Sequence, residues 1–162
     1  MQNFSRKWIW LVVILCLVGL VTIWFSEIRT FVSSQSVERR ASSVELSNGM
    51  TVVVEIADTQ QERVQGLSGH APLADSQGML FLFETKEIQG FWMKDMLFPI
   101  DIIWIDGDTV VGFQQDAQPE TPAKTIFYSP EPVDRVLEVS AGFVARNEVR
   151  VGDVLDVELV DK

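Results

Sequence analysis

The hydrophobic residues of this 162-residue chain follow two different patterns, one near the N-terminus and one in the remainder. Trp8–Phe25 form an unbroken run of eighteen residues without a charged side chain. As a helix that rises about 1.5 Å per residue, this run would extend over roughly 27 Å, close to the hydrocarbon thickness of a bilayer. The pattern predicts a transmembrane anchor at residues 8–25, preceded by a short N-terminus (1–7) and followed by a linker (26–43) and a separate domain (44–160).

Basic residues beside the apolar run predict the orientation of the chain. Arg6 and Lys7 precede the run directly, and Lys and Arg next to a membrane segment favour the cytoplasmic side. We therefore expect a single-pass protein of the cell membrane whose C-terminal domain is extracytoplasmic, either periplasmic or extracellular. Three arginines between residues 29 and 40 argue weakly for the opposite orientation. A cleaved signal peptide is the alternative to an anchor, but Trp24–Ile28 contain no pair of small residues spaced as signal peptidase requires, and Val32–Ser34 is only a marginal cleavage site.

Short runs of strand-forming residues, separated by turn residues, dominate residues 44–160. Asn48-Gly49 lies between two such runs and predicts a type I′ hairpin, and Asp106-Gly107-Asp108 predicts a second hairpin. Thr59–Glu62 has the sequence of a capping box and Gly66 is a typical C-terminal stop, which predicts a short helix at residues 60–65. The other expected elements are strands at residues 44–46, 51–56, 79–83, 90–94, 99–105, 109–114, 135–140 and 154–160, a loop at 119–132 and a second short helix at 141–147.

The expected strands outnumber the expected helices, and the short spacing between strands favours antiparallel pairing over a parallel sheet. We therefore predict a mainly β fold, either a compact antiparallel β-sandwich or a partly closed barrel, with one or two short helices. About 120 residues are enough for one such domain with its own core.

The domain is strongly acidic. From Ala41 onward there are 21 acidic and 8 basic residues, a net charge of −13. Such a surface repels phosphate groups, so we expect no nucleic acid as a partner and no flat contact with anionic lipid headgroups. Neutral or cationic ligands fit this charge better, although solubility alone also explains it.

The segment from Gly90 to Ile105 is almost entirely apolar and contains charges at only three places. Because side chains alternate along a strand, Trp92 and Lys94 share one face. Asp101 falls on an apolar face of the next strand, where an ionised carboxylate needs a partner because an isolated buried charge is costly. Lys94 is the nearest candidate for that partner in the sequence.

Glu138 is a further charged residue flanked by strand-forming apolar residues. Our hypothesis is that Lys94, Asp101 and Glu138 converge with Trp92 on a ligand-binding pocket. The indole ring would offer a stacking surface, and the charged groups would bind hydroxyls or an amine. The alternative interpretation is a structural ion pair, or a Glu138 that faces water.

Most catalytic arrangements are missing from the sequence. His70 is the only histidine and Cys16, in the apolar run, is the only cysteine, so we predict no metal site and no cofactor. The Asp-Gly-Asp turn lacks the spaced acidic ligands of a calcium loop. Asp101 and Glu138 could form the carboxylate pair of a glycosidase-type enzyme, but the sequence identifies no catalytic residue with certainty.

Several ordered motifs resemble those of the domain of unknown function family 192. Members typically contain Phe-Trp-Met-Lys-Asn-Thr followed by Pro-Leu-Asp, whereas here Asp95 and Met96 stand in place of Asn-Thr, and Ile100 in place of Leu. If that Asn-Thr pair contributes hydrogen bonds to a site, this part of the site is altered. The resemblance implies a compact β-rich domain, often exported, with no established activity. The motifs that carry it are Gly66-Leu67, Gly78–Phe81, Phe91–Lys94, Pro99–Asp101, Leu137–Gly142 and Val151–Asp153.

Three kinds of function remain open. The first is a membrane-anchored binding or accessory module for a small polar or carbohydrate-like ligand of the cell envelope. The second is an envelope hydrolase that uses Asp101 and Glu138, and the third is a protein-interaction domain whose partners the sequence does not identify. The absence of a recognisable nucleophile, metal set or cofactor loop favours the binding module.

Overall fold

The computed structural model describes residues 42–120 and 124–160. The predicted N-terminus and anchor, residues 1–25, lie outside the described residues, as does the predicted linker up to residue 41. Ser42 and Ser43, which we had assigned to the linker, belong to the first strand. Among the described residues, no helix has the length and apolar character needed to cross a bilayer.

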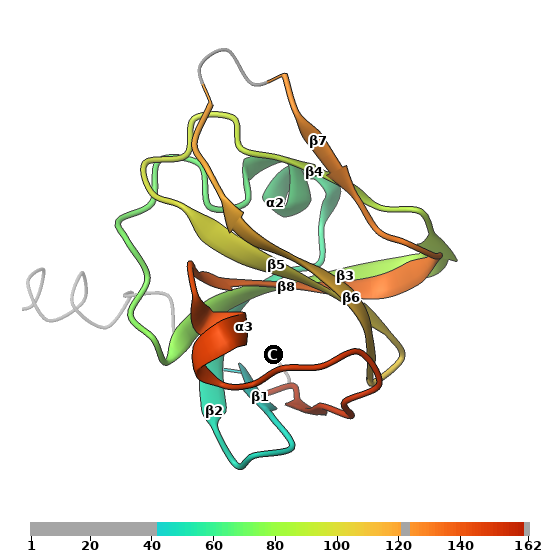
Figure 1. The fold of residues 1–162 in the computed structure, drawn as a ribbon. Coiled ribbons are helices and arrows are strands. Elements are labelled where there is room, and N and C mark those ends of the chain that lie inside the picture. The colour runs from blue at the N-terminus through green and yellow to red at the C-terminus, as the bar shows by residue number, and fades with distance from the viewer. Residues whose placement is uncertain (1–41, 121–123, 161–162) are drawn as a thin grey trace, which may run out of the picture. The chain divides into compact units, whose positions relative to one another are not determined.

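Seven strands of the described residues form one curled sheet, and two further strands form a separate ribbon (Figure 1). All neighbours pair antiparallel except β2 and β3. The sheet order is β6 (Thr109–Ala117), β5 (Ile100–Asp106), β8 (Val133–Ser140), β3 (Gln77–Glu87), β2 (Thr51–Ala57), β1 (Ser42–Glu45) and β9 (Asp156–Glu158), and the ribbon pairs β4 (Gly90–Trp92) with β7 (Ile126–Tyr128).

The sheet curls, and the start of β6 contacts the segment that precedes β9 at the other end of the sheet. Val110 N donates to Asp153 O at 2.9 Å, and Gly152 N donates to Val110 O at 2.8 Å, so the segment before β9 bonds to β6. The prediction of a mainly β fold is confirmed, and its form is that of a curled half-barrel with short helices rather than of two stacked sheets. The bridge between Thr109 and Val154 marks the closure.

The parallel pair β2–β3 departs from the antiparallel prediction. Val54 pairs with Gly78 and Ile56 with Leu80 in parallel register. Residues 58–76, which contain helix α2 (Gln60–Gln65), connect the two strands, and this crossover is long enough to return the chain in the same direction.

The capping box that begins α2 is confirmed. Thr59 Oγ1 accepts a hydrogen bond from Glu62 N at 3.2 Å, and Thr59 N donates to Glu62 Oε2 at 3.0 Å. Gly66 ends the helix with a φ of +48°, a left-handed value that favours glycine. The second short helix, α3, is also confirmed and is shorter than predicted, Phe143–Arg146.

The hairpin at Asn48-Gly49 is confirmed, but its predicted type I′ turn is wrong. A type I′ turn needs a positive φ at both central residues, and only Gly49 has one, +84°. Leu46 N donates to Met50 O at 2.9 Å, which closes a three-residue loop, and Gly49 N donates to Leu46 O at 2.8 Å within it. Asn48 instead uses its side chain, whose Oδ1 accepts from Met50 N at 2.9 Å.

The predicted loop at residues 119–132 contains a strand that the sequence did not reveal, β7. It pairs with β4 in the register Gly90↔Tyr128 and Trp92↔Ile126. Three residues are too few for a readable alternation of side chains, which is why the pattern was missed. Phe91 and Phe127 pair in the same ribbon and both pack against the core.

The two faces of the sheet bury two separate apolar clusters, and this division positions the site. Leu137 and Val139 of β8 belong to the cluster that also contains Phe143 and Val144 around α3. Val136 belongs to the other cluster, which includes Leu67 after α2. Figure 1 shows α3 on one side of the sheet, and α2 with the β4–β7 ribbon on the other.

Candidate functional site

Glu138 lies in the middle of β8, where it pairs with Met79 of β3 on one side and with Ile102 of β5 on the other. Paired residues share a face, so its side chain is on the α2 side of the sheet. Glu138 is only 4 % exposed, and no hydrogen bond or ion pair joins it to another described residue. Burial raises the pKa of the Glu138 carboxyl to about 8, so the group is mostly protonated at neutral pH.

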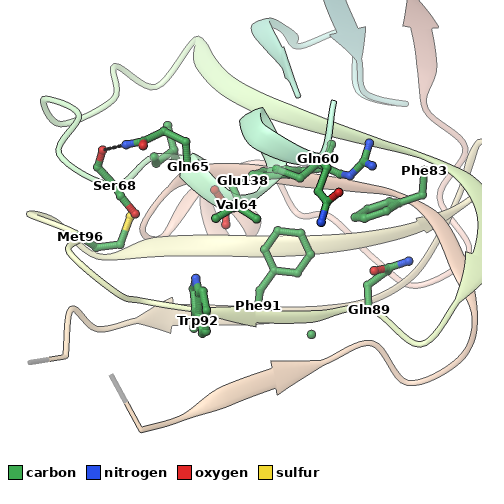
Figure 2. A pocket seen from close by; sticks show the side chains of 15 residues that line it. Gln60, Val64, Gln65, Ser68, Phe83, Gln89, Phe91, Trp92, Met96 and Glu138 are labelled. Carbon is green, nitrogen blue, oxygen red and sulfur yellow. Dashed lines mark hydrogen bonds between the residues drawn. The ribbon is translucent and has the colours of Figure 1, made fainter. Parts of the chain in front are cut away.

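A pocket of about 240 Å³ opens in front of Glu138, between α2 and β4. Figure 2 shows Gln60 and Val64 of α2 opposite Phe91 and Trp92 of β4. Trp92 is 50 % exposed, so much of its indole ring is open to solvent. The aromatic lining consists of Phe81, Phe83, Phe91 and Trp92.

Polar groups stand around the pocket as well. Gln65 Nε2 donates to Ser68 O at 2.9 Å, which fixes one amide at the wall. Arg63 is the only lining residue besides Glu138, among those described, that carries a charge. Its NH1 donates to Leu82 O at 2.9 Å, and its guanidinium carbon lies 5.2 Å from the centroid of the Phe83 ring. The guanidinium is therefore already engaged by the protein.

Asp101 is fully buried on the opposite side of the sheet from Glu138, since it pairs with Val139. Its Oδ1 accepts hydrogen bonds from Asp116 N at 2.9 Å and Gly142 N at 3.1 Å, and its Oδ2 accepts one from Val144 N at 2.9 Å. Asp101 thus finds its partners in backbone N–H groups at the start of α3 and near the end of β6, not in Lys94.

The predicted convergence of four side chains is therefore wrong. Trp92 and Glu138 line one pocket, whereas Asp101 faces away from it. Lys94 is exposed, and its Nζ lies 5.9 Å from the centroid of the Trp92 ring. No ion pair joins Lys94 to either carboxylate in the described residues. The convergence fails because successive residues of a strand point to opposite faces of the sheet. Asp101 pairs with Val139, the residue after Glu138, so the Asp101 and Glu138 side chains lie on opposite faces.

The comparison with protein families identifies the domain. The sequence model of DUF192, described as "Uncharacterized ACR", matches residues 43–157. The chain belongs to this family. The match covers the whole half-barrel from β1 to β9, so the described fold is that of a DUF192 domain.

Two solved structures resemble this DUF192 domain. The first is a protein from Sinorhizobium meliloti described as a candidate transcription regulator, with 35 % identity, a TM-score of 0.67, and coverage of 73 % of this chain and 95 % of that one. The second is a protein of unknown function from Novosphingobium aromaticivorans, with 30 % identity, a TM-score of 0.65, and coverage of 71 % and 82 %. No curated protein matches the chain.

The departure from the usual DUF192 motif falls at the pocket. Met96 lines the pocket and is largely buried, so an apolar side chain stands where the motif has a Thr hydroxyl. Asp95 has a φ of +57°, a left-handed value that both Asn and Asp tolerate, and its carbonyl accepts from Gly69 N at 3.0 Å. The first substitution therefore preserves the backbone, and the second makes the pocket more apolar.

The sequence did not reveal most of the pocket wall. Phe81 and Phe83 share a face with Met79 by simple alternation, but only the long-range pairing of β3 with β8 places that face beside Glu138. The contributions of Gln60 and Val64 depend on how α2 packs over the sheet, which no local pattern encodes.

Proposed function

We propose that this DUF192 domain is a membrane-anchored, extracytoplasmic binding module that holds a small polar or carbohydrate-like ligand of the cell envelope. The observation that carries the proposal is a buried carboxyl group, Glu138, that lacks a protein partner and lies at an aromatic pocket. Aromatic walls with a few fixed polar groups suit ligands that have both an apolar face and hydroxyl groups.

The size of the pocket limits the ligand. Pockets for drug-sized ligands have volumes of roughly 300–1,000 Å³. The cavity at Glu138 has about 240 Å³, which suits a single ring rather than a longer molecule. The exposed edge of Trp92 leaves room for substituents that extend into solvent.

The hydrolase alternative has less support. A glycosidase needs two carboxyl groups on either side of one bond, roughly 5–10 Å apart. Glu138 is the only acidic residue among the described residues that line the pocket, and Asp101 faces the other side of the sheet. Binding by the pocket requires only the residues that are already there.

A protein-interaction function is favoured by one specific feature, the outer face of the β4–β7 ribbon. Ile126 is 45 % exposed and pairs with Trp92, and Tyr128 is 59 % exposed and pairs with Gly90. DNA binding, suggested only by the description of one structural neighbour, conflicts with the net charge of −13 from Ala41 onward.

The test is a thermal-shift and calorimetry screen of the full chain against neutral and amino monosaccharides. An uncharged detergent without a sugar headgroup keeps the predicted anchor in solution and does not compete for the pocket. We expect saturable binding that Trp92→Ala weakens and Tyr128→Ala leaves unchanged. Binding that depends on Tyr128 and not on Trp92 would favour the interaction surface instead, and no saturable binding of any ring would overturn the proposal.

A further inference from the structure

Glu138 differs from Asp101, the other buried acidic residue among those described, in having no hydrogen-bond donor within the protein. Asp101 accepts three backbone N–H groups, and the exposed Glu120 accepts from Lys124 N, Thr125 N and Thr125 Oγ1 at 2.7–3.0 Å. Buried polar groups normally have hydrogen-bond partners in the protein or in ordered water, so the Glu138 carboxyl at the pocket is open to a partner from the pocket, either water or a ligand.

The elements packed around Glu138 supply no free positive charge to that carboxyl. On α2, Arg63 is engaged by Leu82 O and stacks on Phe83. Beside Glu138, β3 contributes Met79 and β5 contributes Ile102, both apolar.

Two further charged residues stand near this side of the sheet. Glu55 of β2 pairs with Met79 and so lies on the same face as Glu138, and it has contacts of its own. Lys94, just beyond β4, is exposed and lies over the Trp92 ring. None of these described cations pairs with Glu138, so the carboxyl group is available to a positive charge carried by a ligand, although the Arg63 guanidinium also lines the pocket.

The rest of the environment also favours a cation. Aromatic faces attract ammonium groups, and four aromatic residues line this pocket. Lys94 Nζ, at 5.9 Å from the Trp92 centroid, already makes such a contact on the same ring. The net charge of −13 from Ala41 onward raises the local concentration of cations around the domain.

We propose that the ligand of this pocket carries a primary amine, whose ammonium group pairs with the carboxylate of Glu138 beside the Trp92 ring. The inference rests on the proposed binding function and names the chemical class of its ligand. When the ammonium group enters, the carboxylic acid of Glu138 releases one proton to solvent, and no covalent bond forms or breaks.

This exchange has a definite pH dependence. Burial holds the pKa of Glu138 at about 8, so below that pH the proton and the ammonium group compete for the carboxylate. The affinity for an amine should rise about tenfold per pH unit between pH 6 and pH 8 and then level off. A neutral ligand should show no such rise, because it does not displace the proton.

The experiment compares two small rings that differ in one group, trans-4-aminocyclohexanol and trans-cyclohexane-1,4-diol. Calorimetry on the full chain at pH 6.0, 6.8 and 7.5, in two buffers of different ionisation enthalpy, measures affinity and released protons. An aliphatic amine stays protonated over this range. We expect the amine to bind at least tenfold more tightly than the diol at pH 7.5, with about one proton released per amine.

Glu138→Gln is the matched variant, because an amide keeps the shape of the protonated carboxyl and cannot ionise. It should lose both the preference for the amine and the proton release. The proton count on the unaltered chain needs no variant and stands even if the variant folds poorly. Equal, pH-independent binding of the two rings would overturn this inference and leave the binding function intact. If the monosaccharide screen and both rings gave no saturable binding, both proposals would fall.

Discussion

Asp101 and Glu138 are buried carboxyl groups on neighbouring strands, yet their surroundings are opposite. Asp101, on the α3 side of β5, is saturated by three backbone N–H donors. Glu138, on the α2 side of β8, has no donor among the described residues and faces a pocket. The comparison teaches that burial alone does not separate a structural carboxyl from a binding one. Under the proposed function, the number of partners that the protein itself supplies makes that separation.

The largest expected effect is a pH-dependent loss of stability caused by Glu138, the carboxyl group without a protein partner. The pKa of Glu138 is raised from 4.5 to about 8 on folding, so the folded state holds its proton more tightly than the unfolded state. Its contribution to stability is complete below pH 4.5 and is lost as the pH rises through 8. Relative to Glu138→Gln, the parent should lose about 1.4 kcal/mol per pH unit over this range, or about 4 kcal/mol by pH 8.

Urea denaturation of both proteins at pH 5, 6.5 and 8 measures this difference. The two should be nearly equally stable at pH 5, because a protonated carboxyl and an amide have similar shape and polarity. Parallel stability profiles at all three pH values would mean that Glu138 is ionised and partnered in solution, and the contrast with Asp101 would disappear.

Asp101, which accepts three backbone N–H groups, should stabilise the fold through these hydrogen bonds. Asp101→Asn replaces one acceptor oxygen with an NH₂ group that faces a backbone N–H, so at least one buried donor loses its partner. We expect a loss of about 3 kcal/mol in the free energy of unfolding. A loss below about 1 kcal/mol would show that Asp101 does not hold α3 in place.

Trp92 tests the aromatic wall of the pocket without disturbing the core, because half of its surface is exposed. Trp92→Ala should weaken binding of a ring-shaped ligand about tenfold, or about 1.4 kcal/mol, and change stability little. Tyr128→Ala on the same ribbon is the control and should bind normally. Calorimetry with the tightest ligand of the screen measures both, and equal effects of the two variants would refute a role specific to the pocket.

Thr59→Ala tests α2, the helix that forms one wall of the pocket. The change removes an acceptor for Glu62 N and should cost about 1 kcal/mol of stability. Because the helix has only six residues, loosening its first turn should also raise hydrogen exchange at the amides of Glu62 and Arg63, which donate to Thr59. Unchanged exchange would show that packing alone holds α2.

The smallest effect is expected for Lys94, the residue that the sequence suggested as the partner of Asp101. Its side chain is exposed and contacts Trp92 rather than a carboxylate. Lys94→Ala should therefore change the free energy of unfolding by less than about 0.5 kcal/mol. A loss of several kcal/mol in the same urea titration would support a buried ion pair between Lys94 and Asp101 and contradict the register of β5.

The local features of the fold could be predicted, and the site only in part. Alternation placed Trp92 and Lys94 on one face and Asp101 among apolar residues, and the capping box located α2 to the residue. The pairing of β5 with β8 joins segments about 35 residues apart, and a shift of one residue in that pairing would reverse the face of every side chain. No local pattern could therefore show that Asp101 and Glu138 point apart.

The pairing of β1 with β9 has a consequence for how the chain is made. Ser43 lies opposite Glu158, and Val160 N donates to Ser42 Oγ at 3.1 Å across 118 residues of sequence. Such distant contacts slow folding, because a long loop must close before they form. The curled sheet cannot be completed until its last strand has left the ribosome, so one edge of β1 stays unpaired throughout synthesis and is exposed to pairing with other chains.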